Sequence, residues 1–360
     1  MMKVNGEVQS MDSRSKVLPR SEPLLSSCPD EANLLSILLN DEAALPWVYS
    51  NFIQLQFITR NYNGSAFPIK YYSPVLKKIC PYVIIQSIDK KVIDTYFLEK
   101  KFSDFVMKAI DDEQYVQSNL NHVHLSNSAF QVNHSVFIYG YDRITETFFV
   151  ADNGFGNGRF AKSTCTFEEL NKAYYEMNDR YNVNIQMAGK VELILCNPKA
   201  PPFILSFSAI RDQIHDYLCS LNSDSRINTF SCHEIYGIAI YDKLLEHMEQ
   251  VKSENAWSHY RPFHILMEHK AMMAQRLAYL RDYHGLSHSE PLIERYKELH
   301  KLCAINVAYN IKYDLTKNVH NLNRIIQNLH LIKEKEMRCL KLFLETLSSQ
   351  IAPKPASLFH

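Results

Sequence analysis

The chain has 360 residues, of which 46% are hydrophobic and 22% are charged, a composition that is typical of globular proteins and excludes an intrinsically disordered chain. Thirty-nine basic residues balance thirty-nine acidic ones, which argues against a nucleic-acid partner because such proteins carry excess positive charge. The longest apolar runs, such as Leu34–Leu39, fall far short of the roughly 20 residues of a transmembrane helix. A membrane-spanning protein is therefore excluded, and no membrane partner is expected.

The length predicts two domains, because domains usually have about 100–200 residues. Residues 1–22 are polar and mixed in charge, and they are predicted to form a disordered tail. No apolar segment typical of a secretory signal occurs near the start of the sequence, so we expect a cytoplasmic protein. The eight cysteines are scattered without a Cys-x-x-Cys pair, which predicts reduced thiols and no cysteine-ligated zinc site.

Residues 23–198 mix helical and strand patterns and are predicted to form an α+β domain. A helix is expected to begin at Cys28, because Pro29 suits the first helical position and leucines follow at helical spacing. A second helix is expected over 166–178, where Thr166 and Glu169 have the spacing of a capping box. Further elements are a helix over 96–109 and strands over 52–59, 82–88, 115–125, 135–141, 147–151 and 191–196.

A change of pattern follows at residues 197–202, Asn-Pro-Lys-Ala-Pro-Pro, which indicate an interdomain linker. Long amphipathic segments with short polar connections then predict an all-α helical bundle domain over residues 203–352. The expected helices cover 208–221, 232–251, 262–283, 291–314 and 319–348. An apolar stripe on these helices could serve packing or dimerisation, which leaves a homodimer open.

Residues 134–152 form the most informative stretch, because two β-rich runs flank the polar turn Asp142–Glu146 as in a hairpin. Pairing centred on residue 143 would place His134 and Asp152 at or near opposing positions, where β-carbons lie about 5 Å apart. A histidine held by a carboxylate is a general base or a metal ligand.

Cys28 is the best candidate for a nucleophile, because free amides and the dipole at a helix start stabilise a thiolate. Together with His134 and Asp152 it forms the constellation of papain-type enzymes. Two acidic residues in the first turn, Asp30 and Glu31, would oppose thiolate formation. Each member also has a plain structural interpretation: Cys28 as a buried inert thiol, His134 as a structural histidine, and Asp152 as the cap of the following turn.

Two neighbouring features extend the candidate site. The glycine-rich stretch 152–158 is interpreted either as a mobile flap, with Asn153, Gly154 and Phe155 contacting substrate, or as a plain loop. His122 and His124 alternate along an expected strand, so both would face one side and could line a pocket for an acceptor. They would bind a metal only with a third ligand, and no metal is expected.

The segments His-Ser-Val-Phe-Ile-Tyr-Gly-Tyr-Asp, Thr-Phe-Phe-Val-Ala-Asp and Thr-Phe-Glu-Glu-Leu, all within residues 134–170, resemble the butirosin biosynthesis protein H family. That family accompanies nonribosomal peptide and aminoglycoside antibiotic biosynthesis in bacteria, and its core has a papain-like (bacteriocin-peptidase-like) fold. The resemblance runs loosely from about residue 25 to 196. Arg-Pro-Phe-His at 261–264 and Glu-His-Lys at 268–270 also resemble the longer members.

The resemblance implies an acyltransferase in which Cys28 accepts the acyl group, His134 acts as the base and Asp152 orients it. The donor would be a thioester on the phosphopantetheine of an acyl or peptidyl carrier protein, the acceptor a small amine, and no other cofactor is implied. Lysine doublets at 77–78, 90–91 and 100–101 could form a basic patch for the carrier protein or simply be solvated surface.

Two departures from the family pattern matter, and the second weakens proteolysis more than acyl transfer. Asn153 replaces the proline that peptidase relatives have after the acid, and no glutamine precedes Cys28. A cysteine peptidase or amidase, and a non-catalytic binding or scaffold protein, stay open as alternatives.

Overall fold

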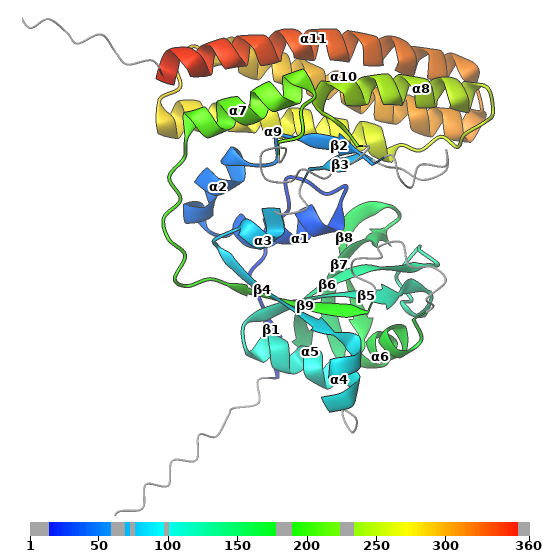
Figure 1. Cartoon of the computed structure of the whole chain (residues 1–360). Coiled ribbons are helices and arrows are strands. Elements are labelled where there is room, and N and C mark those ends of the chain that lie inside the picture. Colours follow the sequence, from blue (N-terminus) through cyan, green and yellow to red (C-terminus); the bar gives the residue numbers. More distant parts are fainter. Residues whose placement is uncertain are drawn as a thin grey trace, which may run out of the picture. The chain divides into compact units, whose positions relative to one another are not determined.

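The computed structural model describes residues 14–58, 69–72, 76–96, 101–177, 189–223 and 234–351. Its contacts divide the chain into two compact units, which Figure 1 colours along the sequence. The sheet unit comprises residues 1–21 and 81–200, and the helical unit comprises residues 22–80 and 201–360. The described chain is a mixed α/β protein with antiparallel sheets and a carboxy-terminal helical region.

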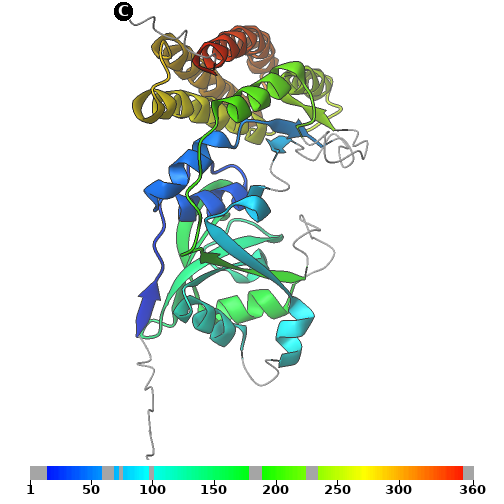
Figure 2. The ribbon, with the colours of Figure 1, turned by 60° about the vertical axis from the view of Figure 1, so that its left-hand side comes forward.

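The sheet unit is built on an antiparallel sheet with strand order β4-β9-β5-β6-β7-β8, in which β1 also pairs with β6. The helices α5 and α6 contact β5 and each other, and Figures 1 and 2 show both on one face of the sheet. The strands are β1 (Ser15–Val17), β4 (Val83–Asp89), β5 (Gln114–Asn121), β6 (Asn133–Asp142), β7 (Thr147–Gly156), β8 (Arg159–Thr166) and β9 (Lys190–Cys196). The helices are α4 (Lys90–Tyr96), α5 (Phe102–Asp111) and α6 (Phe167–Tyr175), and Thr166 with Glu169 forms the expected capping box of α6.

The described part of the predicted disordered tail is ordered, so that prediction is wrong from residue 14 onward. β1 pairs with the end of β6 from Gly140 to Asp142, and Leu18 is buried. The reason is that β5 pairs with β6 only up to Ile138, which leaves the rest of that edge of β6 without a neighbour. An unpaired strand edge is a template for another strand, and nothing in the polar sequence of the tail indicates this distant partner.

The described part of the helical unit contains five long helices, whose axes are roughly parallel in Figure 1 and are seen more nearly end-on in Figure 2. They are α7 (Phe207–Cys219), α8 (Ile240–Lys252), α9 (Arg261–His284), α10 (Glu290–Thr316) and α11 (Val319–Ile351). As predicted, α9 and α10 each have a proline in the first turn, and Gly285 follows the end of α9 in the left-handed region. The unit also contains α1 (Pro29–Leu38), α2 (Leu45–Ser50), α3 (Leu76–Ile79), and the strands β2 (Leu55–Phe57), β3 (Ile69–Tyr71) and β10 (Ile235–Tyr236).

The prediction of an all-α second domain is wrong, because the helical unit contains strands: β10 pairs with β2, and β2 pairs with β3. The helix expected from residue 232 begins at Ile240 instead, and residues 232–233 lie outside the described residues. Ile235 and Tyr236 are extended because their pairing partners are Phe57 and Gln56, which lie far away in the sequence.

The boundary between the units also differs from the predicted division at residues 23–198 and 203–352. The change of unit after Ala200 falls within the expected linker, but residues 22–80 group with the long helices. Buried Arg276 on α9 explains part of this grouping, since its guanidinium donates to the backbone oxygens of Tyr49, Asn51 and Phe52. These carbonyls lie in the last turn of α2 and directly after it, and such contacts have no local signature in the sequence.

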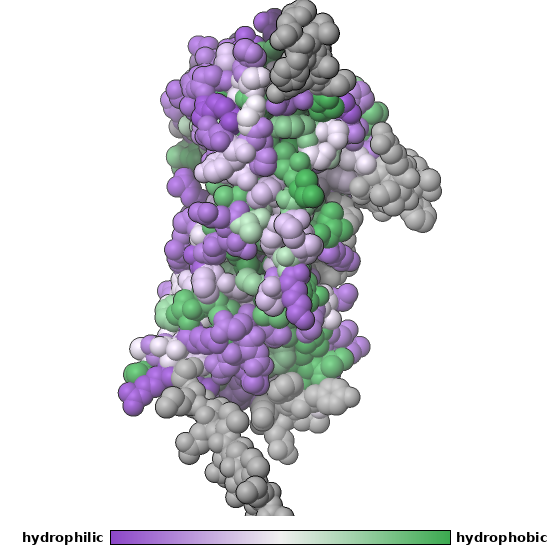
Figure 3. All heavy atoms as spheres, turned by 90° about the vertical axis from the view of Figure 1, so that its left-hand side faces the viewer, coloured by the Kyte–Doolittle hydropathy of each residue, from purple (hydrophilic) through white to green (hydrophobic). Residues whose placement is uncertain are grey.

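Among the described residues, no helix is both long enough and apolar enough to cross a membrane. Several large apolar side chains are exposed, including Ile204, Trp257 and Leu315. On the face drawn in Figure 3, apolar side chains lie interspersed among hydrophilic ones. The homodimer stays a prediction.

Candidate active site

His134 on β6 and Asp152 on β7 contact each other directly. The imidazole Nδ1 of His134 lies 3.0 Å from Oδ1 and 2.9 Å from Oδ2 of Asp152. The carboxylate is completely buried, whereas the His134 side chain keeps 15% of its surface exposed. Since a carboxylate can only accept, Nδ1 carries the hydrogen and Nε2 is left unprotonated in the neutral ring. Nε2 is therefore the atom that can take a proton from a reactant.

The register that brings the two residues together differs from the expected one. Phe137 pairs with Ala151, and a bulge shifts the pairing after Ile138, so that Asp142 pairs with Thr147. Continued from Phe137, this register places Asp152 opposite Val136, two residues from His134. The two side chains nevertheless meet because a shift of two residues keeps both on the same face of the sheet, at diagonal positions.

The Asp152 carboxylate has two further neighbours. The backbone N–H of Gly154 donates to Oδ2 over 2.8 Å, and Nε2 of His122 lies 3.8 Å from the same oxygen. A buried carboxylate is costly unless it is hydrogen-bonded or paired. The amide and the two imidazoles therefore explain how this charge is held inside the sheet unit.

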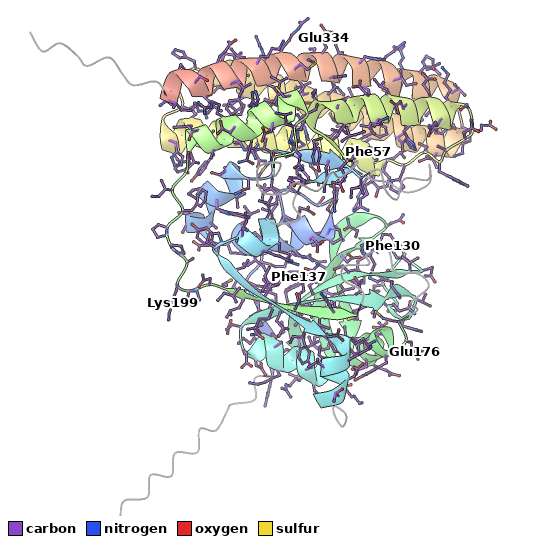
Figure 4. All side chains as sticks on the ribbon, in the orientation of Figure 1. Phe57, Phe130, Phe137, Glu176, Lys199 and Glu334 are labelled. Atoms are coloured by element: carbon purple, nitrogen blue, oxygen red, sulfur yellow. The ribbon has the colours of Figure 1, made fainter. Side chains whose placement is uncertain are left out.

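His122 lies beside the hairpin, as expected, but on a 3-10 turn over His122–His124 and not on a strand. Its ring is fully buried, Nδ1 lies 2.7 Å from Oγ of Ser128, and Nε2 has no hydrogen-bond partner among the described residues. Burial lowers the pKa of His122 to about 4, so the ring is neutral at neutral pH. Phe130, labelled in Figure 4, packs against both His122 and His134 with ring centroids 6.0 and 5.1 Å away.

The prediction that His124 shares a face with His122 is wrong. Nε2 of His124 lies 3.0 Å from a carboxylate oxygen of Glu176, outside the cluster around Asp152. The reason is that the side chain of Asn121 accepts a hydrogen bond from the Val123 N–H, which begins the 3-10 turn and ends the strand alternation.

The glycine-rich stretch is neither a flap nor a plain loop. Residues 152–156 belong to β7, and Asn157 and Gly158, with φ of 53° and 91°, form the two-residue turn to β8. Asn153 is buried and its side-chain amide donates to the Gly158 carbonyl. Phe155 packs on His122, with ring centroids 5.7 Å apart. Gly154 and Phe155 thus border the cluster, whereas Asn153 supports the turn.

Gly154 allows the close approach of His122. A Cβ at this position would lie 2.7 Å from Nδ1 of His122 and 2.9 Å from Oγ of Ser128. We expect Gly154→Ala to lower the free energy of unfolding by about 1–3 kcal/mol, the usual effect of overpacking, as measured by urea denaturation. The matched control is the same substitution in a His122→Ala background, where the ring is gone and the cost should fall. An equal cost in both backgrounds would contradict this explanation.

Cys28 is the N-cap residue of α1, with Pro29 at the first helical position, as the sequence predicts. The thiol is not activated in the way expected from a helix start. Burial, and the negative charge of Glu31 next to it, raise the pKa of the Cys28 thiol to about 12, while Arg261 acts in the opposite direction. Cys28 belongs to the helical unit, whereas His134 and Asp152 belong to the sheet unit.

Sequence reasoning missed two contacts of this segment. Nη2 of Arg261 lies 3.8 Å from Sγ of Cys28, and Glu268 binds the two serines before it. Arg261 and Glu268 are seven residues apart on α9, and this spacing is the signal that places both on one face of a helix.

His122, His134 and Asp152 are the residues of the described chain that could hold a metal ion, because one ligand atom from each lies within 4.8 Å of the others. Two imidazoles and a carboxylate suit Zn²⁺. Such an ion would compete with the His134–Asp152 hydrogen bond, which uses the same carboxylate.

Comparison of the sequence with protein-family models finds no match, and comparison with curated proteins finds no similar chain.

Proposed function

We propose that the chain is a cysteine-dependent acyltransferase with a papain-like arrangement of catalytic groups, of the kind that acts in natural-product biosynthesis. The observation that carries the proposal is the His134–Asp152 pair, in which a fully buried carboxylate fixes an imidazole whose Nε2 is available as a base. Cys28 at the start of α1 is the proposed nucleophile.

In the first step, the Cys28 sulfur attacks the carbonyl carbon of an acyl thioester on a carrier protein. His134 takes the thiol proton and passes it to the departing phosphopantetheine thiolate, so that one thioester replaces another. In the second step, an acceptor amine attacks the acyl-cysteine, His134 takes the amine proton, and the Cys28 thiolate leaves and is reprotonated. The amide product is more stable than the thioester, so this step runs downhill.

A thioester donor suits this site better than a peptide. Both tetrahedral intermediates need a donor for the oxyanion, and the backbone N–H of Cys28 at the helix start is the candidate. Losing an oxyanion donor typically costs about 3–4 kcal/mol of barrier. Because the sequence has no glutamine before Cys28, a reactive thioester is the more accessible substrate, and a cysteine peptidase or amidase is the alternative.

Alkylation of the cysteines between pH 5 and 9, mapped by mass spectrometry, tests the proposal. A thiol with a pKa of about 12 has only about 10⁻⁴ of its molecules ionised at pH 8, so it should react slowly unless a base assists it. We expect Cys28 to react well below pH 8 in the native protein and to lose this reactivity in His134→Ala. The exposed thiols of Cys196 and Cys219 are internal references that should not change.

One result would contradict the proposal, and a second experiment would distinguish a transferase from a peptidase. Slow alkylation of Cys28 that does not depend on His134 would favour a non-catalytic binding or scaffold protein. If Cys28 is reactive, incubation with an acyl-carrier thioester or with a peptide shows by the mass of the Cys28 adduct whether transferase or peptidase chemistry applies. The same experiment after EDTA treatment should be unchanged, because the proposed reaction uses no metal.

A further inference from the structure

One face of α9 contacts the segment that precedes and includes Cys28. Arg261, His264 and Glu268 recur at spacings of three and four residues, so their side chains lie along one side of the helix. Nε2 of His264 lies 3.7 Å from Glu268, which links the middle of this row to its end. These residues belong to the segments 261–264 and 268–270, which have no role in the proposed reaction as described above.

Glu268 holds the two residues before Cys28 in place. Its Oε1 accepts hydrogen bonds from the backbone N–H of Ser26, over 2.7 Å, and from the Ser26 hydroxyl, over 2.6 Å. Its Oε2 accepts from the backbone N–H and the hydroxyl of Ser27. With four donors, the buried carboxylate is satisfied and the backbone that leads into Cys28 is fixed to α9.

Arg261, at the other end of the row, contacts the sulfur itself. Nη2 lies 3.8 Å from Sγ of Cys28, which places a guanidinium group beside the thiol. The other ionisable groups facing this thiol are Glu31 on α1, Glu268 on α9 and the buried hydroxyl of Tyr71 on β3. Burial raises the pKa of Tyr71 well above 10, so this group is neutral, and the two carboxylates oppose the negative charge of a Cys28 thiolate.

We propose that Arg261 is a catalytic residue that stabilises the Cys28 thiolate, and that Glu268 is a positioning residue that holds the nucleophile segment against it. This inference rests on the proposed function, in which the thiolate both attacks the thioester and leaves the acyl-enzyme. The carboxy-terminal helical region thereby contributes to the chemistry and is not only a packing partner of the amino-terminal segment.

The test measures the rate of Cys28 alkylation by iodoacetamide against pH in the native full chain, in Arg261→Gln and in Arg261→Lys. Because a neighbouring opposite charge typically changes a pKa by 1–3, we expect alkylation at pH 8 to be about tenfold slower or more in Arg261→Gln. Arg261→Lys keeps the charge and should recover part of the rate. Arg281→Gln, on the same helix but paired with exposed Asp282, is the matched control and should behave like the native protein.

Equal alkylation profiles in the native protein and in Arg261→Gln would overturn the inference. So would an Arg261→Lys variant that reacts as slowly as Arg261→Gln, provided that both variants have the same urea midpoint of unfolding as the native protein. Alkylation of the His134→Ala variant distinguishes failure of this inference from failure of the proposed function. Slower alkylation in Arg261→Gln but not in His134→Ala would support Arg261 and contradict the proposed base. The reverse pattern would keep the base and remove Arg261 from the reaction.

Discussion

Asp152→Asn is expected to lower the rate of acyl transfer by about 10⁴-fold, the loss seen when the orienting carboxylate of a catalytic triad becomes an amide. Asp152 holds the hydrogen of His134 on Nδ1 through two contacts of 2.9 and 3.0 Å. An amide of the same size can present its N–H₂ group to that nitrogen instead, which moves the ring hydrogen to Nε2. The ring then no longer offers its outer nitrogen as a base.

Single-turnover transfer from an acyl-carrier thioester to an amine measures this effect. The matched control is Asp142→Asn, at the turn end of β6, where Oδ1 accepts hydrogen bonds from the Ile144 and Thr145 amides. This control should retain transfer within a few-fold of the native rate. A similar loss in both variants would assign the effect to the hairpin fold, and full activity in Asp152→Asn would contradict the role of the carboxylate.

Glu336→Ala is expected to have the largest effect on stability, because it leaves a buried charge without a partner. Glu336 on α11 and Lys270 on α9 form an ion pair, and both side chains are completely buried. The Tyr241 hydroxyl donates to the other oxygen of Glu336 over 2.6 Å. Removing one partner of a buried pair typically costs about 3–5 kcal/mol.

The same network reaches the amino-terminal segment. Lys270 donates to Nδ1 of His269 over 2.9 Å, and Nε2 of His269 donates to the Ile53 carbonyl over 2.8 Å. Burial, and the positive charge of Lys270, place the pKa of His269 well below its usual range, so the ring stays neutral and can both accept and donate. Loss of Glu336 should therefore loosen the contact of α9 with residues 22–80 as well as with α11.

Urea denaturation measures the change, with Glu334→Ala as the matched control. Glu334 is exposed on α11, where Figure 4 labels it, and its one ion pair among the described residues is with Arg338, one turn further on. Its loss should therefore change the free energy of unfolding by less than about 0.5 kcal/mol. The double variant Lys270→Met with Glu336→Leu should regain most of the loss, because well-packed apolar residues can replace a buried pair. A cost for Glu336→Ala no larger than that for Glu334→Ala would show that Lys270 finds another partner.

Much of the local structure follows from the sequence, because its causes lie within a few residues. Pro29 begins α1 after Cys28, Thr166 with Glu169 begins α6, and Gly285 ends α9. The polar turn between two β-rich runs was enough to predict that His134 and Asp152 come together. Hydrophobic periodicity likewise indicated the long helices α9, α10 and α11 close to their observed ends.

Tertiary structure decided what depends on distant partners. The strand β1 forms because β6 extends beyond the residues that pair with β5, and β10 forms because it pairs with β2. The approach of Arg261 to the sulfur of Cys28 likewise joins residues 233 positions apart, and the burial that raises the pKa of this thiol arises only in the folded chain. A sequence records hydrogen-bonding capacity, periodicity and charge, but desolvation and non-local pairing arise only when the chain has folded.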